Sequence, residues 1–267
     1  MLGSPIAHSL SPALHRAAYA ELGLTGWTYD RFEVAEDELA DFVARCDDRW
    51  RGLSLTMPLK SAALELGEVD PVARFASAGN TLIFDGLRRR IYNTDVSGLV
   101  WAVRQVSTAP PRTVTVLGSG ATARSALLSA VQLGARAITV VARAPGRAEQ
   151  LASLAEALDV DAALLPWQAT LPPADLVIST VTSGALDAMM SAVAEAAPLI
   201  FDVVYEPWPT ALAVAAQRAG GTVISGLDLL VGQALDQIEL MTGRTVPAQV
   251  LYDAGRAALA SARSARP

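Results

Sequence analysis

The segment that most constrains the fold is TVTVLGSGATARSALLSAVQLGARAITVVAR, residues 113–143. It begins with a run typical of a β-strand, passes through two closely spaced glycines into a helical apolar pattern, and ends in a second strand-like run. This order predicts a βαβ unit with parallel strands. Because helices cover both faces of a parallel sheet, we expect an α/β domain here.

The alternation of strand and helix continues to residue 225. Helical patterns such as that of residues 146–158 separate four further strand-like runs. These runs cover residues 161–165, 174–180, 199–204 and 222–225. Together with the first two, they predict six strands in a doubly wound, mostly parallel sheet.

The first hundred residues predict a second α/β unit with shorter elements. We expect helices over 15–24 and 35–46, and strands over 28–34, 52–58 and 80–86. The segment VSTAPPR, residues 106–112, is the best candidate for a linker because of its paired prolines. Two helical stretches follow residue 226 with no strand between them, and their pattern alone does not assign them to either unit.

Charge and cysteine content exclude several classes of function. The formal net charge of -6 argues against nucleic acid as the main partner, which would require clustered lysine and arginine. Cys46 is the only cysteine, so neither an intramolecular disulfide nor a cysteine-based metal cluster can form. His8 and His15 belong to no metal-ligand pattern. No apolar run approaches the ~20 residues of a membrane helix, and MLGSPIAHS is not typical of a signal peptide. We therefore expect a cytoplasmic protein that binds neither a metal nor a membrane.

The glycines of VLGSGATA indicate a nucleotide site. Gly118, Gly120 and Ala123 form a GxGxxA pattern between a strand and a helix. Glycine permits the tight turn and lets the backbone approach a pyrophosphate, while the start of the helix offers unpaired N–H groups. Arg124 would add positive charge there. The alternative is a tight turn that binds no ligand.

The end of the second strand favours NADP over NAD. A site that prefers NAD carries Asp or Glu there for the ribose 2'-hydroxyl, whereas this chain has Arg143, with Arg147 four residues on. A guanidinium binds the 2'-phosphate of NADP through charge and paired hydrogen bonds. The alternative is that Arg147 faces solvent on its helix.

Several polar residues among the first hundred lie at positions where the predicted fold does not require a polar side chain. Taken singly, they are explained as helix caps, turn residues or a solvated cation. Taken together, they predict a site for a polar ligand. They are Ser9, Ser11, Thr56, Lys60, Asn80 and Asp95.

Five motifs in this order resemble the shikimate dehydrogenase family. They are GSPIAHSLSPALH, SLTMPLK, SAGNT, NTDVSG and GLDLLVGQA. The segment ARAPGRA is similar to the family's arginine motif for the NADP phosphate, and DVVYEPWPT is similar to its segment near the nicotinamide. The resemblance spans nearly the whole chain.

The resemblance implies reversible, NADPH-dependent reduction of 3-dehydroshikimate to shikimate in aromatic amino-acid biosynthesis. Charge develops on the ketone oxygen as hydride arrives at carbon, and a nearby acid lowers that barrier. Lys60 is the implied acid, and Asp95 would hold its ammonium and contact the same hydroxyl. The implied substrate residues are Ser9, Ser11, Thr56, Asn80, Tyr205 and Gln233.

The resemblance also implies the cofactor, NADP(H), and the domain limits. Residues 1–99 with 228–267 would bind the substrate, residues 100–227 would bind NADP, and the active site would lie between the two domains. The implied cofactor residues are Gly118, Gly120, Ala121, Ala123, Arg124, Arg143, Arg147 and Thr180.

Several positions depart from the family pattern. Ser54 replaces an asparagine, which weakens one expected substrate contact, and Ala142 and Ala144 replace residues expected to bind the 2'-phosphate. The strand that usually precedes the first motif is nearly absent, so we expect either an upstream start or a short strand. Two alternatives stay open: a quinate/shikimate dehydrogenase that uses NAD, and a non-catalytic NADP-binding regulator of the same fold. The sequence does not decide between a monomer and a homodimer.

Overall fold

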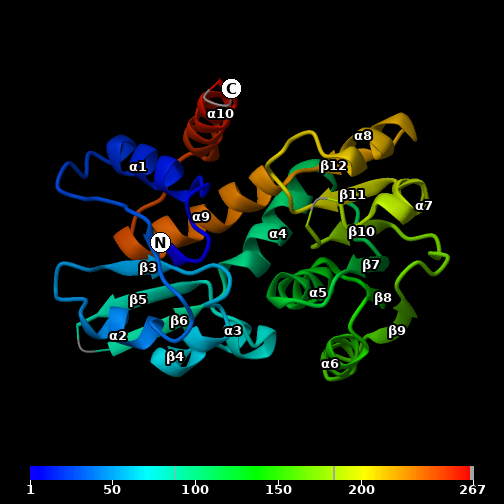
Figure 1. Cartoon of the computed structure of the whole chain (residues 1–267), viewed down its shortest axis with the longest axis horizontal. Helices are drawn as coiled ribbons and strands as arrows, with labels where there is room; N and C mark the ends of the chain where they lie inside the picture. The colour runs from blue at the N-terminus through cyan, green and yellow to red at the C-terminus, as the bar shows by residue number, and fades with distance from the viewer. Residues whose placement is uncertain (87, 183, 265–267) are drawn as a thin grey trace. The chain divides into compact units, whose positions relative to one another are not determined.

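The computed structural model describes residues 1–86, 88–182 and 184–264. The chain forms two compact units, of which the first comprises Met1–Gly98 with the chain from Leu230 onward and the second comprises Leu99–Leu229 (Figure 1). The first boundary falls within helix α4 (Thr94–Val106). Residues 106–112, the predicted linker, therefore connect α4 to β7 (Thr113–Leu117) inside the second unit. Prolines predict a loop there, but tertiary contacts decide where one unit ends.

The sheet of the second unit confirms the predicted doubly wound fold. Six parallel strands of the described chain lie in the order β12-β11-β10-β7-β8-β9. The strand order therefore reverses between β7 and β10, where ligands of such sheets bind. The strands besides β7 are β8 (Ala137–Ala142), β9 (Asp161–Pro166), β10 (Leu176–Ser179), β11 (Leu199–Asp202) and β12 (Thr222–Ile224).

Helices cover both faces of this sheet (Figure 1). One apolar core joins the sheet to α4, α5 (Ala121–Leu133) and α6 (Pro145–Glu156). A second core joins it to η2 (Asp187–Met189), α7 (Met190–Glu195) and α8 (Ala211–Arg218). Successive side chains of a strand point to opposite faces of the sheet. Val177 of β10 therefore packs in the second core and Ile178 in the first.

The first unit is built on a mixed sheet of shorter strands. Its order is β3-β5-β6-β4, in which β5 pairs antiparallel with both neighbours and β4 pairs parallel with β6. The strands are β3 (Gly52–Ser54), β4 (Glu68–Val69), β5 (Thr81–Asp85) and β6 (Arg88–Tyr92). The sequence reading missed β6, because RRRIY has no apolar alternation, and it missed the two-residue strand β4.

A separate pair of strands lies at the start of the chain. β1 (Leu2–Gly3) pairs in parallel with β2 (Phe32–Glu33), and Leu2 also bridges Leu55 just after β3. The strand expected over 28–34 thus covers two residues, because its partner β1 is equally short.

Helices also pack on this smaller sheet. One face meets α2 (Leu39–Ala44) and η1 (Ala62–Leu66) in a core that contains Leu39, Ala63 and Leu82. α9 (Gly226–Thr242) lies against the other face, where a Cβ on Gly52 would stand 3.1 Å from Met241. The remaining helices of the unit are α1 (Ser11–Glu21), α3 (Pro71–Ala76) and α10 (Ala248–Ser264), and α1 packs along α10. No helix among the described residues has the length and apolarity to cross a membrane.

Candidate active site

Lys60 and Asp95 form a largely buried ion pair in the first unit. The distance from Lys60 Nζ to Asp95 Oδ2 is 2.5 Å, and only 15% of the lysine side chain and 4% of the aspartate side chain are exposed. A pair with so little access to water keeps its geometry, because separating the charges would leave each one poorly solvated. Lysine has three N–H donors, so this contact leaves Lys60 able to donate to a ligand.

Local hydrogen bonds place both members of the pair. The carbonyl of Lys60 accepts from the backbone N–H of Gly79 at 2.7 Å, which ties the lysine loop to the SAGNT segment. Leu59 anchors the same loop because its side chain is fully buried. Asp95 lies in the first turn of α4, where the side chain of Asn93 accepts its backbone N–H at 3.1 Å.

Asn80 joins this pair to α9. Its Nδ2 donates to Asp95 Oδ1 at 2.9 Å and to Gln233 Oε1 at 2.9 Å, while its Oδ1 accepts from the backbone N–H of Thr94 at 2.8 Å. Four predicted site residues, each from a different one of the ordered motifs, therefore form one connected polar cluster. They are Lys60, Asn80, Asp95 and Gln233.

The other predicted substrate residues of this unit lie in neighbouring segments. Ser11 is buried at the start of α1, and Ser9 is half-buried and accepts the backbone N–H of Ser11 at 3.3 Å. Thr56 is half-buried, and its backbone N–H donates to Leu2 at 3.0 Å. Among the described residues, none of these three side chains bonds to Lys60 or to the carboxylate beside it. Their contact with a substrate stays a prediction.

Ser54 has an internal role that the sequence did not reveal. Its hydroxyl accepts from Tyr29 Oη at 2.6 Å and donates to Gln237 Oε1 at 2.8 Å, and only 4% of the residue is exposed. Sequence reasoning missed Gln237, although it follows Gln233 by four residues and so lies on the same face of the helix.

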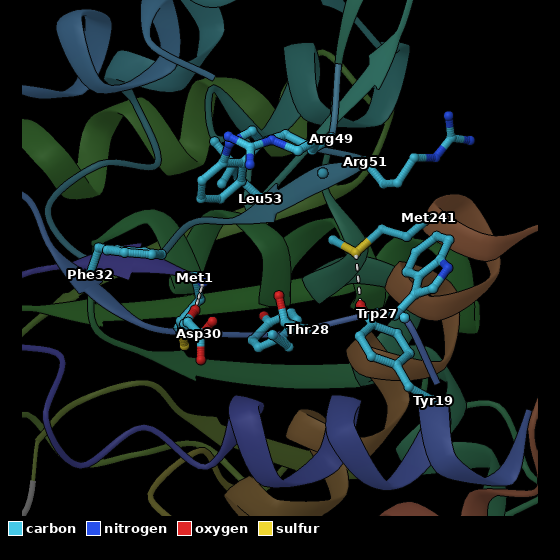
Figure 2. A pocket seen from close by; sticks show the side chains of 14 residues that line it. Met1, Tyr19, Trp27, Thr28, Asp30, Phe32, Arg49, Arg51, Leu53 and Met241 are labelled. Carbon is cyan, nitrogen blue, oxygen red and sulfur yellow. Dashed lines mark hydrogen bonds between the residues drawn. The ribbon is translucent and has the colours of Figure 1, made fainter. Parts of the chain in front are cut away.

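A cavity of about 660 Å³ lies elsewhere in the first unit. Figure 2 shows Tyr19, Trp27 and Met241 at one end of it, and Met1, Asp30 and Phe32 at the other. The Tyr19 hydroxyl donates to the sulfur of Met241 at 3.9 Å. The cavity lining includes none of the predicted substrate residues, so it is separate from the Lys60 cluster.

In the second unit, Gly118 lies where a side chain cannot fit. Its φ is 113°, in the region that favours glycine, and a Cβ there would lie 2.4 Å from Thr180 Oγ1. Thr180 Oγ1 in turn donates to the carbonyl of Leu117 at 2.7 Å. The loops that follow β7 and β10 are thereby joined at the point where the strand order reverses.

The start of α5 offers backbone donors beside these loops. Gly120 is the N-cap residue and has no side chain to occupy the first N–H groups, and a Cβ there would meet no atom within 4 Å. Ala121 begins the helix, and Ala123 is fully buried, which suits close packing of the helix on the sheet. An N-terminus of this kind attracts phosphate.

The predicted arginines gather beside this loop. Burial lowers the pKa of Arg124, and the nearby charge of Arg147 lowers it further. Arg143 is exposed just after β8, with its guanidinium carbon 5.6 Å from the ring centroid of Trp167. The charge and the open backbone donors fit a dinucleotide with an extra phosphate. The sequence did not predict a role for Trp167.

Tyr205 belongs to the second unit and follows β11. It is half-buried, and its pKa is raised by burial and, to a lesser degree, by the charge of Glu206. Its contact with the substrate stays a prediction. No group of His, Cys, Asp and Glu side chains in the described chain could hold a metal ion.

Two family models match parts of the chain. One, the shikimate dehydrogenase substrate binding domain, matches residues 1–82. The other, the shikimate 5'-dehydrogenase C-terminal domain, matches residues 226–254. The first match contains Lys60 and Asn80, and the second contains Gln233.

Whole-length relatives agree with these matches. The shikimate dehydrogenase (NADP(+)) of Methanothermobacter thermautotrophicus is 32% identical, over 95% of this chain and 94% of its own length. The crystal structure of Mycobacterium tuberculosis shikimate dehydrogenase has a TM-score of 0.88 and 39% identity, covering 96% of this chain and 97% of that one. The shikimate 5-dehydrogenase of Thermus thermophilus, in complex with NADP(H) and shikimate, has a TM-score of 0.82 and 29% identity, covering 97% and 98%.

Proposed function

Because the chain belongs to the shikimate dehydrogenase family, we propose that it interconverts 3-dehydroshikimate and shikimate with NADP(H), and that Lys60 serves the reacting oxygen. The activity follows from relatives at 32% to 39% identity that match along nearly the whole chain. The geometry of this chain supports the roles of the individual residues.

The observation that carries the proposal is the buried contact between Lys60 and Asp95. NADPH, when bound, supplies the hydride that reaches the ketone carbon. The Lys60 ammonium donates to the ketone oxygen as negative charge develops there, and passes it a proton. Asp95 holds the ammonium at a fixed position and accepts a hydrogen bond from the product hydroxyl. In the reverse reaction the neutral amine of Lys60 accepts that proton.

Hydroxyl and carboxylate groups of the substrate need matching partners. Asn80 and Gln233 stand beside the ion pair and offer amide groups to the ring hydroxyls. Ser9, Ser11 and Thr56 bind the carboxylate as neutral donors in this proposal. A site of matched polar groups rejects analogues that lack a hydroxyl, because its own groups would then be left unpaired.

Residues 100–227, which lie within the second unit, bind the cofactor in this proposal. Backbone N–H groups at the start of α5 hold the pyrophosphate, and Gly118 with Thr180 shape the turn beside it. Arg143 and Arg147 bind the 2'-phosphate, with Arg124 adding positive charge. Tyr205 contacts the substrate or the nicotinamide in this proposal. Residues 1–99 with 228–267 bind the substrate.

The test is an initial-rate assay of purified protein in four parallel reactions, which combine shikimate or quinate with NADP or NAD. We expect turnover with shikimate and NADP to exceed the other three reactions by far. Quinate oxidation with NAD would assign the chain to the alternative dehydrogenase. Binding of NADP without any turnover would assign it to the non-catalytic regulators.

A further inference from the structure

Gln237 bridges two strands of the first unit, one turn of α9 beyond Gln233. Ser54 of β3 and Thr81 of β5 pair directly across the sheet. The Gln237 carboxamide accepts from Ser54 Oγ at 2.8 Å and donates from Nε2 to Thr81 Oγ1 at 2.9 Å. At most 4% of each of these residues is exposed, so water does not compete for their hydrogen bonds.

These hydrogen bonds have a single direction. An amide nitrogen only donates, so Thr81 Oγ1 accepts from Gln237 and gives its own hydrogen to Asn80 Oδ1, 2.9 Å away. The backbone N–H of Thr94 donates to the same oxygen at 2.8 Å. Both donors fix which end of the Asn80 amide is oxygen, and its nitrogen therefore faces Asp95 Oδ1.

The hydrogen bonds at the Tyr29 end of this series have the same donor-to-acceptor direction. Tyr29 donates to Ser54 at 2.6 Å, and His15 Nε2 stands 3.2 Å from Gln237 Oε1. Burial lowers the pKa of His15 to about 3, so its ring is neutral near pH 7. Because the Gln237 oxygen can only accept, the single proton of the ring belongs on Nε2, which donates to it. One path of hydrogen bonds thus runs from Tyr29 through Ser54, Gln237, Thr81 and Asn80 to the carboxylate of Asp95.

We propose that Thr81 and Gln237 are positioning residues, which orient the Asn80 amide so that it donates to Asp95 and Gln233. This inference rests on the proposed function, because its readout is shikimate turnover. Neither residue needs to touch the substrate. Without the Thr81 hydroxyl, Asn80 Oδ1 still accepts from the backbone N–H of Thr94 but loses the hydrogen bond from Thr81, which Gln237 of α9 orients. The Asn80 amide can then rotate more easily. The carboxylate that holds Lys60 then loses its fixed partner.

The test compares two substitutions of one buried residue. Thr81→Val keeps the shape and removes the hydroxyl, whereas Thr81→Ser keeps the hydroxyl and removes a methyl group. We expect Thr81→Val to lower kcat with shikimate about tenfold, with KM for NADP within about twofold of the parent, and Thr81→Ser to restore kcat to within about threefold. Thr115→Val is the matched control, since the buried Thr115 hydroxyl has no hydrogen-bond partner among the described residues.

A second variant keeps the inference testable if Thr81→Val fails to fold. Gln237→Met removes the amide at similar volume and should by itself lower kcat with shikimate while KM for NADP stays within about twofold of the parent, because Thr81 then loses the donor that orients its hydroxyl. Parental kcat in Gln237→Met would overturn the inference. Where both single variants fold, their effects should not multiply, because both break one chain of hydrogen bonds. Equal kcat in Thr81→Val and the parent would overturn the inference, as would equal losses in the valine and serine variants. No shikimate turnover by the parent would instead contradict the proposed function.

Discussion

Gly98 and Gln233 approach so closely that a Cβ on Gly98 would lie 2.6 Å from the backbone nitrogen of Gln233. The contact joins α4, which carries Asp95, to α9, which carries Gln233. Beside it, the hydroxyl of Ser97 donates to Asp236 across the same two helices. A residue without a side chain thus sets the spacing between two parts of the proposed site.

Gly98→Ala should therefore disturb both stability and substrate binding. The added methyl group meets backbone rather than a movable side chain, so the helices must separate, at a cost of about 1–3 kcal/mol in the free energy of unfolding. Urea unfolding and KM for shikimate measure the two effects, and KM should rise. Gly26→Ala is the control, since a Cβ there would meet no atom within 4 Å. A Gly98→Ala protein with parental stability would contradict the close packing.

Lys60→Met should remove most of the activity while the cofactor still binds. The methionine keeps an unbranched apolar stem but cannot donate a proton, so we expect kcat to fall about 10²–10⁴-fold. Leaving the buried Asp95 without its cation should also lower the thermal midpoint. Asp95→Asn in the same background should recover part of that midpoint without recovering kcat. Full turnover by Lys60→Met with only a raised KM for shikimate would contradict the assignment of Lys60 as the proton donor.

Arg143→Ala should weaken NADP binding and leave NAD binding nearly unchanged. In the proposed cofactor site the guanidinium pairs with the 2'-phosphate, which NAD lacks, so KM for NADP should rise about tenfold or more. Arg136→Ala serves as the control, because Arg136 is also exposed but precedes β8, at the opposite end of that strand. An unchanged KM for NADP in Arg143→Ala would contradict this reading of cofactor choice.

Acid should destabilise the first unit through His15. Burial lowers its pKa from 6.5 to about 3, so between these values the unfolded chain binds a proton that the folded protein does not. The free energy of unfolding therefore falls as the pH drops below 6.5, by about 1.4 kcal/mol per pH unit from this group. Urea unfolding at pH 7.5, 6.5, 5.5 and 4.5 measures the slope.

His15→Leu should reduce that slope, whereas the same change at the exposed His8 should preserve it. The leucine variant should also lose some stability at pH 7.5, because His15 stacks on Tyr29 with 4.0 Å between ring centroids. Parallel pH curves for His15→Leu and the parent would show that another group causes the acid sensitivity.

Local patterns predicted most of the second unit but less of the first. The six strands of the second unit could be predicted because each is a run of alternating or continuous apolar residues flanked by glycine, proline or a helical pattern. In the first unit, β1 and β2 are too short to show a period. β6 begins with three arginines, and its strand form depends on pairing with β5 and β4. Pairing with a neighbour, rather than propensity, decides such strands.

The βαβ frame, the glycine turn and the ordered motifs could all be predicted from the sequence alone. These motifs contain Lys60, Asn80, Asp95 and Gln233. These features depend on residues close together in the chain, so spacing reveals them. The hydrogen bonds of Ser54 to Tyr29 and Gln237 could not be predicted in this way, nor could the contact of Gln237 with Thr81 across 156 residues of sequence. Packing of α9 on the sheet sets those contacts, and they form because a buried polar group is stable only where the fold brings it a partner.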